Sequence, residues 1–278
     1  MAKMFHLKYR IPASEEDSIT EILGTDPSVS FSVEVTGGIS FINVYSRSNK
    51  PSEIIDENYL ESISTIDLEA LNNKWADDYR GSELTENFYV KSHCMFNTAE
   101  DFPHVIILDP VGSFGDGCHA TTKLCASMLE EVINSYPDSS KKNLAMLDIG
   151  TGSGILSIEA ALLGIEDIDL FDLYRASVLK AGKNLELNGI FNLIPFQGDI
   201  YKYNFVRKYD IITANLLTSV IEDNIEKMHS GLADNGRLII SGIGIKWTDE
   251  IIDIINRTGL KIIKHKVLEG WNGFMLSC

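Results

Sequence analysis

Alternating apolar and polar positions predict the first elements of the chain. Met4 to Ile11 reads as a strand. Ser14-Glu15-Glu16-Asp17 then places an N-cap hydroxyl before an acidic first turn, which indicates the start of a helix. Residues 31–45 alternate on both sides of Gly37-Gly38, as expected for two strands joined by a tight turn. The first 45 residues are therefore predicted to form a strand, a helix and a β-hairpin.

A second helical stretch is expected from Pro51 to about Ser64. It completes a β-α-β-β-α order, which predicts a small α+β domain of the ferredoxin-like type over residues 1–65. Residues 66–85 read as a helical linker around Trp75. Residues 86–278 would then form a second, larger domain.

Short apolar segments alternate with helical stretches in this larger domain. The segments predicted as strands lie near residues 144–149, 167–172, 193–197, 209–214, 236–242, 261–268 and 271–277. Such alternation specifies a mostly parallel sheet covered by helices on both faces. The fold expected for residues 86–278 is an α/β, Rossmann-like sheet of seven strands.

Composition indicates a globular protein without a membrane anchor. Hydrophobic residues make up 44% and charged residues 23% of the 278 residues, which leaves enough apolar surface for a core. No apolar run reaches the roughly 18 residues of a spanning helix, and residues 1–12 lack the apolar stretch of a signal peptide. We therefore expect a cytoplasmic protein. The cysteines, which show no C-x-x-C pair, are expected to be reduced thiols rather than metal ligands: Cys94, Cys118, Cys125 and Cys278.

The charge is strongly negative and unevenly distributed. The formal net charge is −16, and residues 1–104 hold 18 acidic against 8 basic side chains. A negative surface disfavours direct binding to nucleic acid, whose phosphates need positive potential. The charge suits a basic protein partner, and it is equally compatible with a role in solubility alone.

A glycine loop follows the predicted strand 144–149. Gly150-Thr151-Gly152-Ser153-Gly154 leads directly into a predicted helix, Ile155 to Leu163. Glycines permit a sharp turn and a close approach of a ligand to the backbone, and free N–H groups at a helix start favour an anionic group. Asp172, 22 residues after Gly150, ends the next strand, where a carboxylate can accept ribose hydroxyls. The arrangement predicts a site for an adenosine-bearing cofactor.

Two cofactor classes fit a glycine loop of this kind. A dinucleotide fingerprint, G-x-G-x-x-G, would need its third glycine at position 155, where the chain has Ile155. Asp148, two residues before the first glycine, is typical of the loop in S-adenosylmethionine-dependent methyltransferases. These details favour S-adenosyl-L-methionine, with a nicotinamide-dependent dehydrogenase as the alternative.

Further candidate residues follow the next two strands. Asp199 can accept the adenine amino group or, alternatively, cap the next turn. Asn215 ends the fourth strand, at the edge where open α/β sheets place ligands. Tyr174 and Phe196 suit either an adenine wall or the core.

Residues 108–122, LDPVGSFGDGCHATT, resemble the L-D-P-G-x-A-F-G-T-G-x-H-x-T-T signature of the PrmA family, the bacterial ribosomal protein L11 methyltransferases. The similarity continues through residues 148–156 and through Asn215-Leu216-Leu217, which looks like the family's N-I-L. Trp75 with residues 88–90 is similar to its tryptophan-bearing linker. The chain departs from the family at Asp116, Cys118 and Tyr174.

The resemblance implies a methyltransferase that modifies lysine or N-terminal amines of a ribosomal protein, with residues 1–65 recognising a basic protein substrate. The alternative is a methyltransferase acting on small molecules. The resemblance also implies a loop from Phe114 to Thr122 over the methyl donor. Candidate catalytic residues are Asn215 and His119, the latter as a general base or merely a helix cap. Candidate cofactor-binding residues are Phe114, Thr122, Asp148, Gly150, Gly152, Gly154, Asp172, Asp199 and Asn215.

Overall fold

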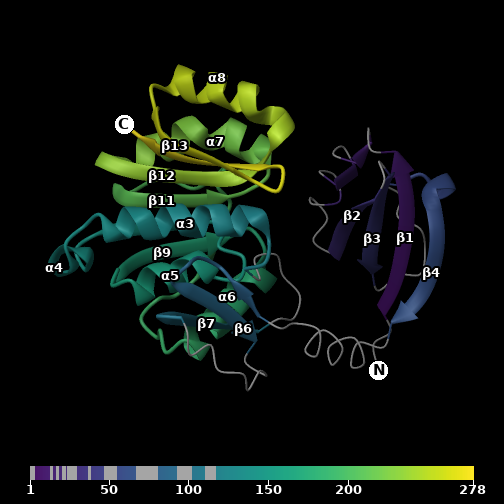
Figure 1. The fold of residues 1–278 in the computed structure, drawn as a ribbon, viewed down its shortest axis with the longest axis horizontal. Coiled ribbons are helices and arrows are strands. Elements are labelled where there is room, and N and C mark those ends of the chain that lie inside the picture. The colour runs from purple at the N-terminus through teal and green to yellow at the C-terminus, as the bar shows by residue number, and fades with distance from the viewer. Residues whose placement is uncertain are drawn as a thin grey trace. The chain divides into compact units, whose positions relative to one another are not determined.

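A computed structural model of the protein describes residues 4–12, 15–16, 19–20, 23, 30–36, 39–46, 55–66, 81–92, 102–109 and 117–278. The chain divides into two compact units, Met1–Asp78 and Tyr79–Cys278. Figure 1 labels the elements of both units, and each unit is considered by itself.

The smaller unit contains a four-stranded antiparallel sheet in the order β2-β3-β1-β4. Its strands are β1 (Met4–Pro12), β2 (Ser30–Thr36), β3 (Ile39–Ser46) and β4 (Leu60–Ile66). The predicted first strand and the hairpin are confirmed. This sheet order, with helical residues between β1 and β2, is that of a ferredoxin-like α+β domain.

One face of this small sheet carries the core of the unit. Leu7, Tyr9 and Ile11 alternate along β1 and are at most 1% exposed. They pack with residues of β3 and with two apolar positions one helical turn apart: Ile42, Val44, Ile19 and Leu23. The period of two along β1 is what buries one face of a sheet and leaves the other in solvent.

The helix expected from Pro51 to Ser64 is wrong where the structure describes it. Glu57–Tyr59 is a single 3₁₀ turn, and Leu60–Ile66 forms β4, which pairs with β1 through Leu7 and Ile63. The segment Leu-Glu-Ser-Ile-Ser-Thr-Ile is rich in β-branched residues and serine, which disfavour helix. Because positions 61–65 are all exposed, no buried alternation revealed the strand. Residues 51–54 and the linker residues around Trp75 lie outside the described residues.

The larger unit contains the predicted seven-stranded sheet, in the order β10-β9-β8-β11-β12-β14-β13. The first five strands of this order run parallel, and β14 lies antiparallel between β12 and β13. The third predicted strand, 193–197, is shortened to two residues. The strands are β8 (Ala145–Ile149), β9 (Asp167–Asp172), β10 (Phe196–Gln197), β11 (Tyr209–Asn215), β12 (Leu232–Gly244), β13 (Lys261–Leu268) and β14 (Trp271–Ser277).

Helices cover both faces of this sheet (Figure 1). Consecutive residues of one strand enter opposite cores: Ile211 packs with α3 and α5, whereas Ile212 packs with α7 and α8. This alternation follows from the period of two in a strand with both faces buried. The helical elements are α3 (Ala120–Asn134), α4 (Asp138–Lys141), α5 (Ile155–Leu162), α6 (Arg175–Leu187), α7 (Thr218–Gly231), η2 (Ile245–Trp247) and α8 (Thr248–Thr258).

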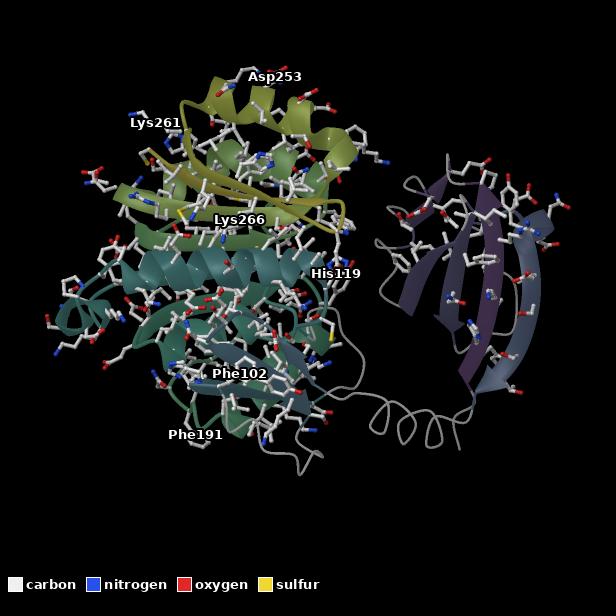
Figure 2. The ribbon with its side chains drawn as sticks, viewed as in Figure 1. Phe102, His119, Phe191, Asp253, Lys261 and Lys266 are labelled. Atoms are coloured by element: carbon white, nitrogen blue, oxygen red, sulfur yellow. The ribbon has the colours of Figure 1, made fainter. Side chains whose placement is uncertain are left out.

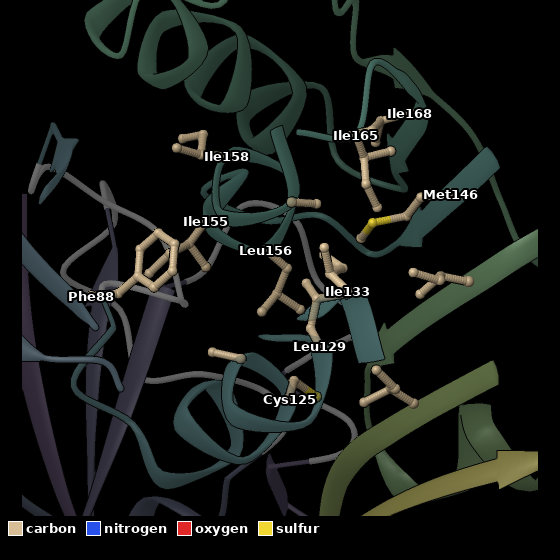
Figure 3. Packing of buried hydrophobic residues seen from close by; sticks show 14 of the residues in the cluster. Phe88, Cys125, Leu129, Ile133, Met146, Ile155, Leu156, Ile158, Ile165 and Ile168 are labelled. Atoms are coloured by element: carbon tan, nitrogen blue, oxygen red, sulfur yellow. The ribbon is translucent and has the colours of Figure 1, made fainter. Parts of the chain in front are cut away.

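A second, three-stranded sheet was not predicted, and the helical linker expected over residues 66–85 is wrong at its described end, where Ser82–Glu83 forms a strand. It has the order β5-β6-β7, formed by β5 (Ser82–Glu83), β6 (Phe88–Ser92) and β7 (His104–Leu108). Figure 3 shows Phe88 of β6 beside apolar residues of α5, above Cys125 and Leu129 of α3. The three-stranded sheet thus extends the core of the larger unit on the side where α3 packs. Within the described residues, no helix combines the length and the apolar character needed to span a membrane.

Candidate functional site

The glycine loop connects β8 to α5 and lies beside the carboxyl end of β9. Gly150, Gly152 and Gly154 have φ values of 70°, 55° and 83°, which residues with side chains rarely adopt. The N–H groups of Gly150 and Thr151 donate to the carbonyl of Phe171, at 2.9 and 3.0 Å. The loop is therefore held at the end of β9, next to Asp172.

Close packing also favours glycine at two of these positions. A Cβ atom at Gly150 would lie 2.3 Å from Cδ2 of Leu216, in the segment that follows β11. A Cβ at Gly154 would lie 3.3 Å from the Cα of Ala181 in α6. The missing side chains let the end of β11 and helix α6 approach the loop, so residues from three parts of the chain meet at one edge.

Asp148 holds the glycine loop through hydrogen bonds to buried hydroxyl groups. Its side chain is 1% exposed and accepts hydrogen bonds from three hydroxyls, those of Thr151, Ser157 and Thr213, each at 2.7 Å. Burial raises its pKa, and these hydrogen bonds oppose that shift. The structure places Asp148 among protein hydroxyls, where it fixes the loop. Ser157 and Thr213 were not predicted; hydroxyls at buried positions of an apolar helix and strand were the available signal.

Asp172 lies at the end of β9 and is 7% exposed. One carboxylate oxygen accepts the N–H of Gly152 at 3.0 Å, and the other accepts the N–H of Tyr174 at 2.9 Å. An ionised carboxylate has about four acceptor positions, so both oxygens keep capacity for further donors such as ribose hydroxyls. The carboxylate is thereby oriented by backbone donors on both sides.

Four N–H groups of the glycine loop form hydrogen bonds within the chain. The N–H groups of Gly150, Thr151, Gly152 and Gly154 all donate to acceptors within the chain. The N–H groups expected to favour an anionic group are those at the start of α5 (Ile155–Leu162), and these four amides precede that helix. Since they hold the turn and orient Asp172, their contribution to ligand binding is the shape of the loop.

Two buried polar atoms at this edge have no hydrogen-bond partner among the described residues. They are Oγ1 of Thr122, in the first turn of α3, and Oδ1 of Asn215, at the end of β11. Gly117, five residues before Thr122, would bring a Cβ within 3.2 Å of Ile155 at the start of α5. The structure therefore brings the chain near Thr122 to the end of the glycine loop. Buried unpaired polar atoms are costly, which is typical of groups that await a ligand.

His119 lies at the start of α3 (Figure 2). As the N-cap residue it accepts the N–H of Thr121 through Nδ1 at 3.3 Å, and its ring meets Trp271 edge-on with centroids 5.2 Å apart. The helix-cap role considered from the sequence is thus present in the structure. Any role in proton transfer would use the other ring nitrogen.

Phe196 lies in β10, which pairs with β9, and Asp199 follows β10. Asp199 accepts the N–H of Tyr201 at 3.0 Å, which caps the turn after β10, and it forms an ion pair with Lys202. The ring of Phe196 is tilted against that of Phe171, with centroids 5.4 Å apart, and Phe196 is 37% exposed. Both residues are near the end of β9 because Phe196 and Phe171 are register partners. Phe114 lies outside the described residues.

The site fits an adenosine-bearing cofactor. A glycine loop permits close approach, and the Asp172 carboxylate can accept hydroxyls. Oγ1 of Thr122 and Oδ1 of Asn215, which no described residue pairs, are available to a ligand. Among the described residues, no group of three or more histidine, cysteine or acidic side chains is placed to hold a metal ion.

Comparison with known proteins agrees with this chemistry. The family described as ribosomal protein L11 methyltransferase (PrmA) matches residues 40–277. A ribosomal protein L11 methyltransferase of Staphylococcus carnosus is 35% identical over 220 residues, which are 78% of this chain and 68% of that protein. The corresponding protein of Macrococcus caseolyticus is 34% identical over the same shares.

A solved structure resembles the chain as well. The crystal structure of a ribosomal protein L11 methylase from Lactobacillus delbrueckii subsp. bulgaricus has a TM-score of 0.65 and 28% sequence identity. The match covers 72% of this chain and 98% of that one. The expected fold and the cofactor S-adenosyl-L-methionine are thereby confirmed. The chain belongs to the ribosomal protein L11 methyltransferase (PrmA) family of S-adenosylmethionine-dependent methyltransferases.

Proposed function

We propose that this protein methylates amino groups, on lysine side chains or at the N-terminus, of a ribosomal protein of the L11 type. The observation that carries the proposal is Oδ1 of Asn215, which has no hydrogen-bond partner among the described residues, because an amide oxygen accepts and an amine donates. The names of its relatives support a ribosomal protein as the acceptor.

Asn215 would orient the amine for reaction. When bound, the cofactor supplies a methyl group carried on a positively charged sulfur. The amine must be neutral to react, although the reference pKa of lysine is about 10.4. Accepting one N–H would direct the nitrogen lone pair, and a partly buried position disfavours the ammonium form. The methyl–nitrogen bond forms as the methyl–sulfur bond breaks, and the surplus amine proton leaves to solvent or to a base.

The remaining predicted residues receive roles within the same proposal. Asp172 binds the ribose hydroxyls, Thr122 contacts the cofactor, and Asp199 lies toward the adenine. Asp148 and the three loop glycines shape the site. Phe114 is assigned to the cover of the cofactor by resemblance alone. His119 is the second catalytic candidate, acting through Nε2, since Nδ1 caps α3.

The smaller unit is assigned to substrate recognition. Residues 1–104 are acidic, which suits attraction of a basic protein and argues against direct contact with nucleic acid. A ribosomal protein substrate places the enzyme in the cytoplasm. If charge attracts the substrate, raising the ionic strength should slow association of the full chain, because exposed charges more than about 8 Å apart are screened near 0.15 M salt.

Mass spectrometry tests the activity directly. The full chain is incubated with isotopically labelled S-adenosyl-L-methionine and purified, unmethylated ribosomal protein L11. Labelled methyl groups on lysine or N-terminal amines are the expected result, with Asn215→Ala as the control. If the wild-type protein binds the cofactor but labels only small amines, the proposed protein acceptor is wrong.

A further inference from the structure

Helix α6 carries Asn184 on its buried side and ends at a second asparagine, its C-cap residue Asn188. Asn184 is fully buried, and Asn188 follows it one turn later. Both lie on the same helix face as Ala181 and Leu185, which belong to the core next to α5. An amide in an apolar helix face costs free energy unless its donor and acceptor groups are paired, so the partners of these side chains are informative.

The two asparagines continue the hydrogen bonding of strand β7, which ends the three-stranded sheet. Asn188 accepts the N–H of Ile107 at 2.9 Å and donates to its carbonyl at 2.7 Å. Asn184 accepts the N–H of Asp109, two residues further, at 2.8 Å. Four residues of helix rise about 6.0 Å and two residues of strand about 6.6 Å, so side chains four apart on α6 match backbone groups two apart on β7.

Asn184 differs from Asn188 in its second contact. Its amide nitrogen donates to the carbonyl of Ser153, in the glycine loop, at 2.7 Å. Next to that bond, the backbone of Gly154 packs on Ala181. One side chain therefore connects the glycine loop to Asp109, from which the chain continues toward Thr122.

We propose that Asn184 is a positioning residue that couples the glycine loop to Asp109, the residue that follows β7. This amide keeps the carbonyl of Ser153, in the loop of the proposed cofactor site, and the N–H of Asp109 in a common position. Asn188 holds β7 without touching the loop. The inference rests on the cofactor site proposed above, and it assigns Asn184 no contact with the cofactor or the substrate.

A matched pair of variants separates coupling from stability. Asn184→Ala and Asn188→Ala each remove amide hydrogen bonds to β7, so both should lower the melting temperature. Only Asn184→Ala also frees the Ser153 carbonyl. Calorimetry with S-adenosylhomocysteine should then show affinity about fivefold to tenfold weaker for Asn184→Ala, from the loss of one buried hydrogen bond, and little change for Asn188→Ala. Equal affinities of the two folded variants would overturn the proposal.

The substitution Asn184→Asp removes only the hydrogen bond to the carbonyl of Ser153. The aspartate keeps an oxygen for the N–H of Asp109 but replaces the donor toward Ser153 with a second oxygen. A protonated carboxyl group can donate again. Affinity for S-adenosylhomocysteine should therefore be weak at neutral pH and recover toward the wild-type value as the pH falls, with the wild type measured at each pH. A constant deficit would contradict the coupling.

The wild-type protein provides a test without any variant. On binding S-adenosylhomocysteine, the amide protons of Asp109 and of the glycine loop should gain protection from hydrogen exchange together, while that of Ile107 changes less. Binding without added protection at Asp109 would overturn the coupling. Absence of binding by the folded wild type would instead refute the cofactor site on which it rests.

Discussion

The two ends of the large parallel sheet treat polar side chains in opposite ways. At the amino end, the Arg207 guanidinium donates two hydrogen bonds to Asp167 and two to Asp169. Tyr209, the first residue of β11, donates its hydroxyl to Asp169 at 2.7 Å. Arg207 lowers the pKa of Asp167, and burial raises the pKa of Tyr209. Polar groups here are paired with one another.

At the carboxyl end, Asn215 is the last residue of the same strand, and within the part of the chain that the structure describes its side-chain oxygen has no hydrogen-bond partner, nor has that of Thr122. Asp172 retains acceptor capacity although it is almost buried. Polar groups that are complete within the protein contribute to stability, whereas groups left incomplete are available to a ligand. Substitutions at polar residues of the two ends and of the core test this difference between paired and unpaired groups.

The largest expected effect is on activity at the carboxyl end. Asn215→Ala should reduce kcat roughly 100-fold, the loss typical of one aligned polar group, with little change in melting temperature. Tyr209→Phe, at the opposite end of β11, is the matched control and should leave kcat unchanged. Steady-state kinetics and thermal unfolding of both variants would decide. Similar kcat losses in the two variants would remove the distinction between the ends.

The next effect concerns cofactor affinity. Asp172→Ala removes the carboxylate proposed to accept the ribose hydroxyls, and binding should weaken by about 1–3 kcal/mol. Asp167→Ala, a carboxylate at the amino end of the same strand, should leave affinity unchanged. Isothermal titration calorimetry with S-adenosylhomocysteine measures both. Unchanged affinity in Asp172→Ala would exclude this residue from the site.

Glu159 in α5 is an exception that sharpens the comparison. It is fully buried, and neither carboxylate oxygen has a hydrogen-bond partner among the described residues. Burial, and secondarily the neighbouring Glu130, raises its pKa well above the ordinary value. We therefore interpret it as a neutral carboxyl group inside the core rather than as a ligand-binding residue.

Glu159→Gln should therefore raise stability without changing activity. Below a pH of about 4.5, the glutamate is protonated in both the folded and the unfolded chain. As the pH rises, the unfolded chain loses this proton first, so the wild type loses stability relative to Glu159→Gln. Chemical denaturation from about pH 5 to 8 should show a growing difference. A constant difference, or a loss of cofactor binding, would contradict this interpretation.

The smallest effect is expected at the amino end. Arg207→Met should lower the free energy of unfolding by about 1 kcal/mol, since its partners are partly exposed, and leave kcat unchanged. Because the folded-state pKa of Asp167 is depressed, its contribution is present above the unfolded pKa near ~3.9 and is lost as the pH falls. The stability difference from wild type, measured by urea titration, should shrink in acid. A difference that persists below pH ~3 would argue against the ion pair.

The number of buried apolar residues in a strand influenced whether that strand could be predicted from the sequence. The strands β8, β9, β11, β12 and β14 of the large sheet are mostly buried, and their apolar runs identified them. Strand β4 has five exposed positions and was mistaken for a helix. The strands β5 to β7 were not predicted: they are two to five residues long, although β6 and β7 have buried residues at every second position over part of their length.

By itself, the sequence determined the family, the sheet and the glycine loop, because the glycine spacing, Asp148, Asp172 and the signature at 108–122 are local patterns. Only the tertiary structure decided how these residues act. Asp148 accepts hydrogen bonds from three hydroxyls, four of the loop N–H groups donate within the chain, and Asn184 bonds to both Asp109 and Ser153. The bonds of Thr213 to Asp148 and of Asn184 to Ser153 join residues that are distant in sequence, so these partners depend on the packing of the whole unit and not on the spacing of either residue.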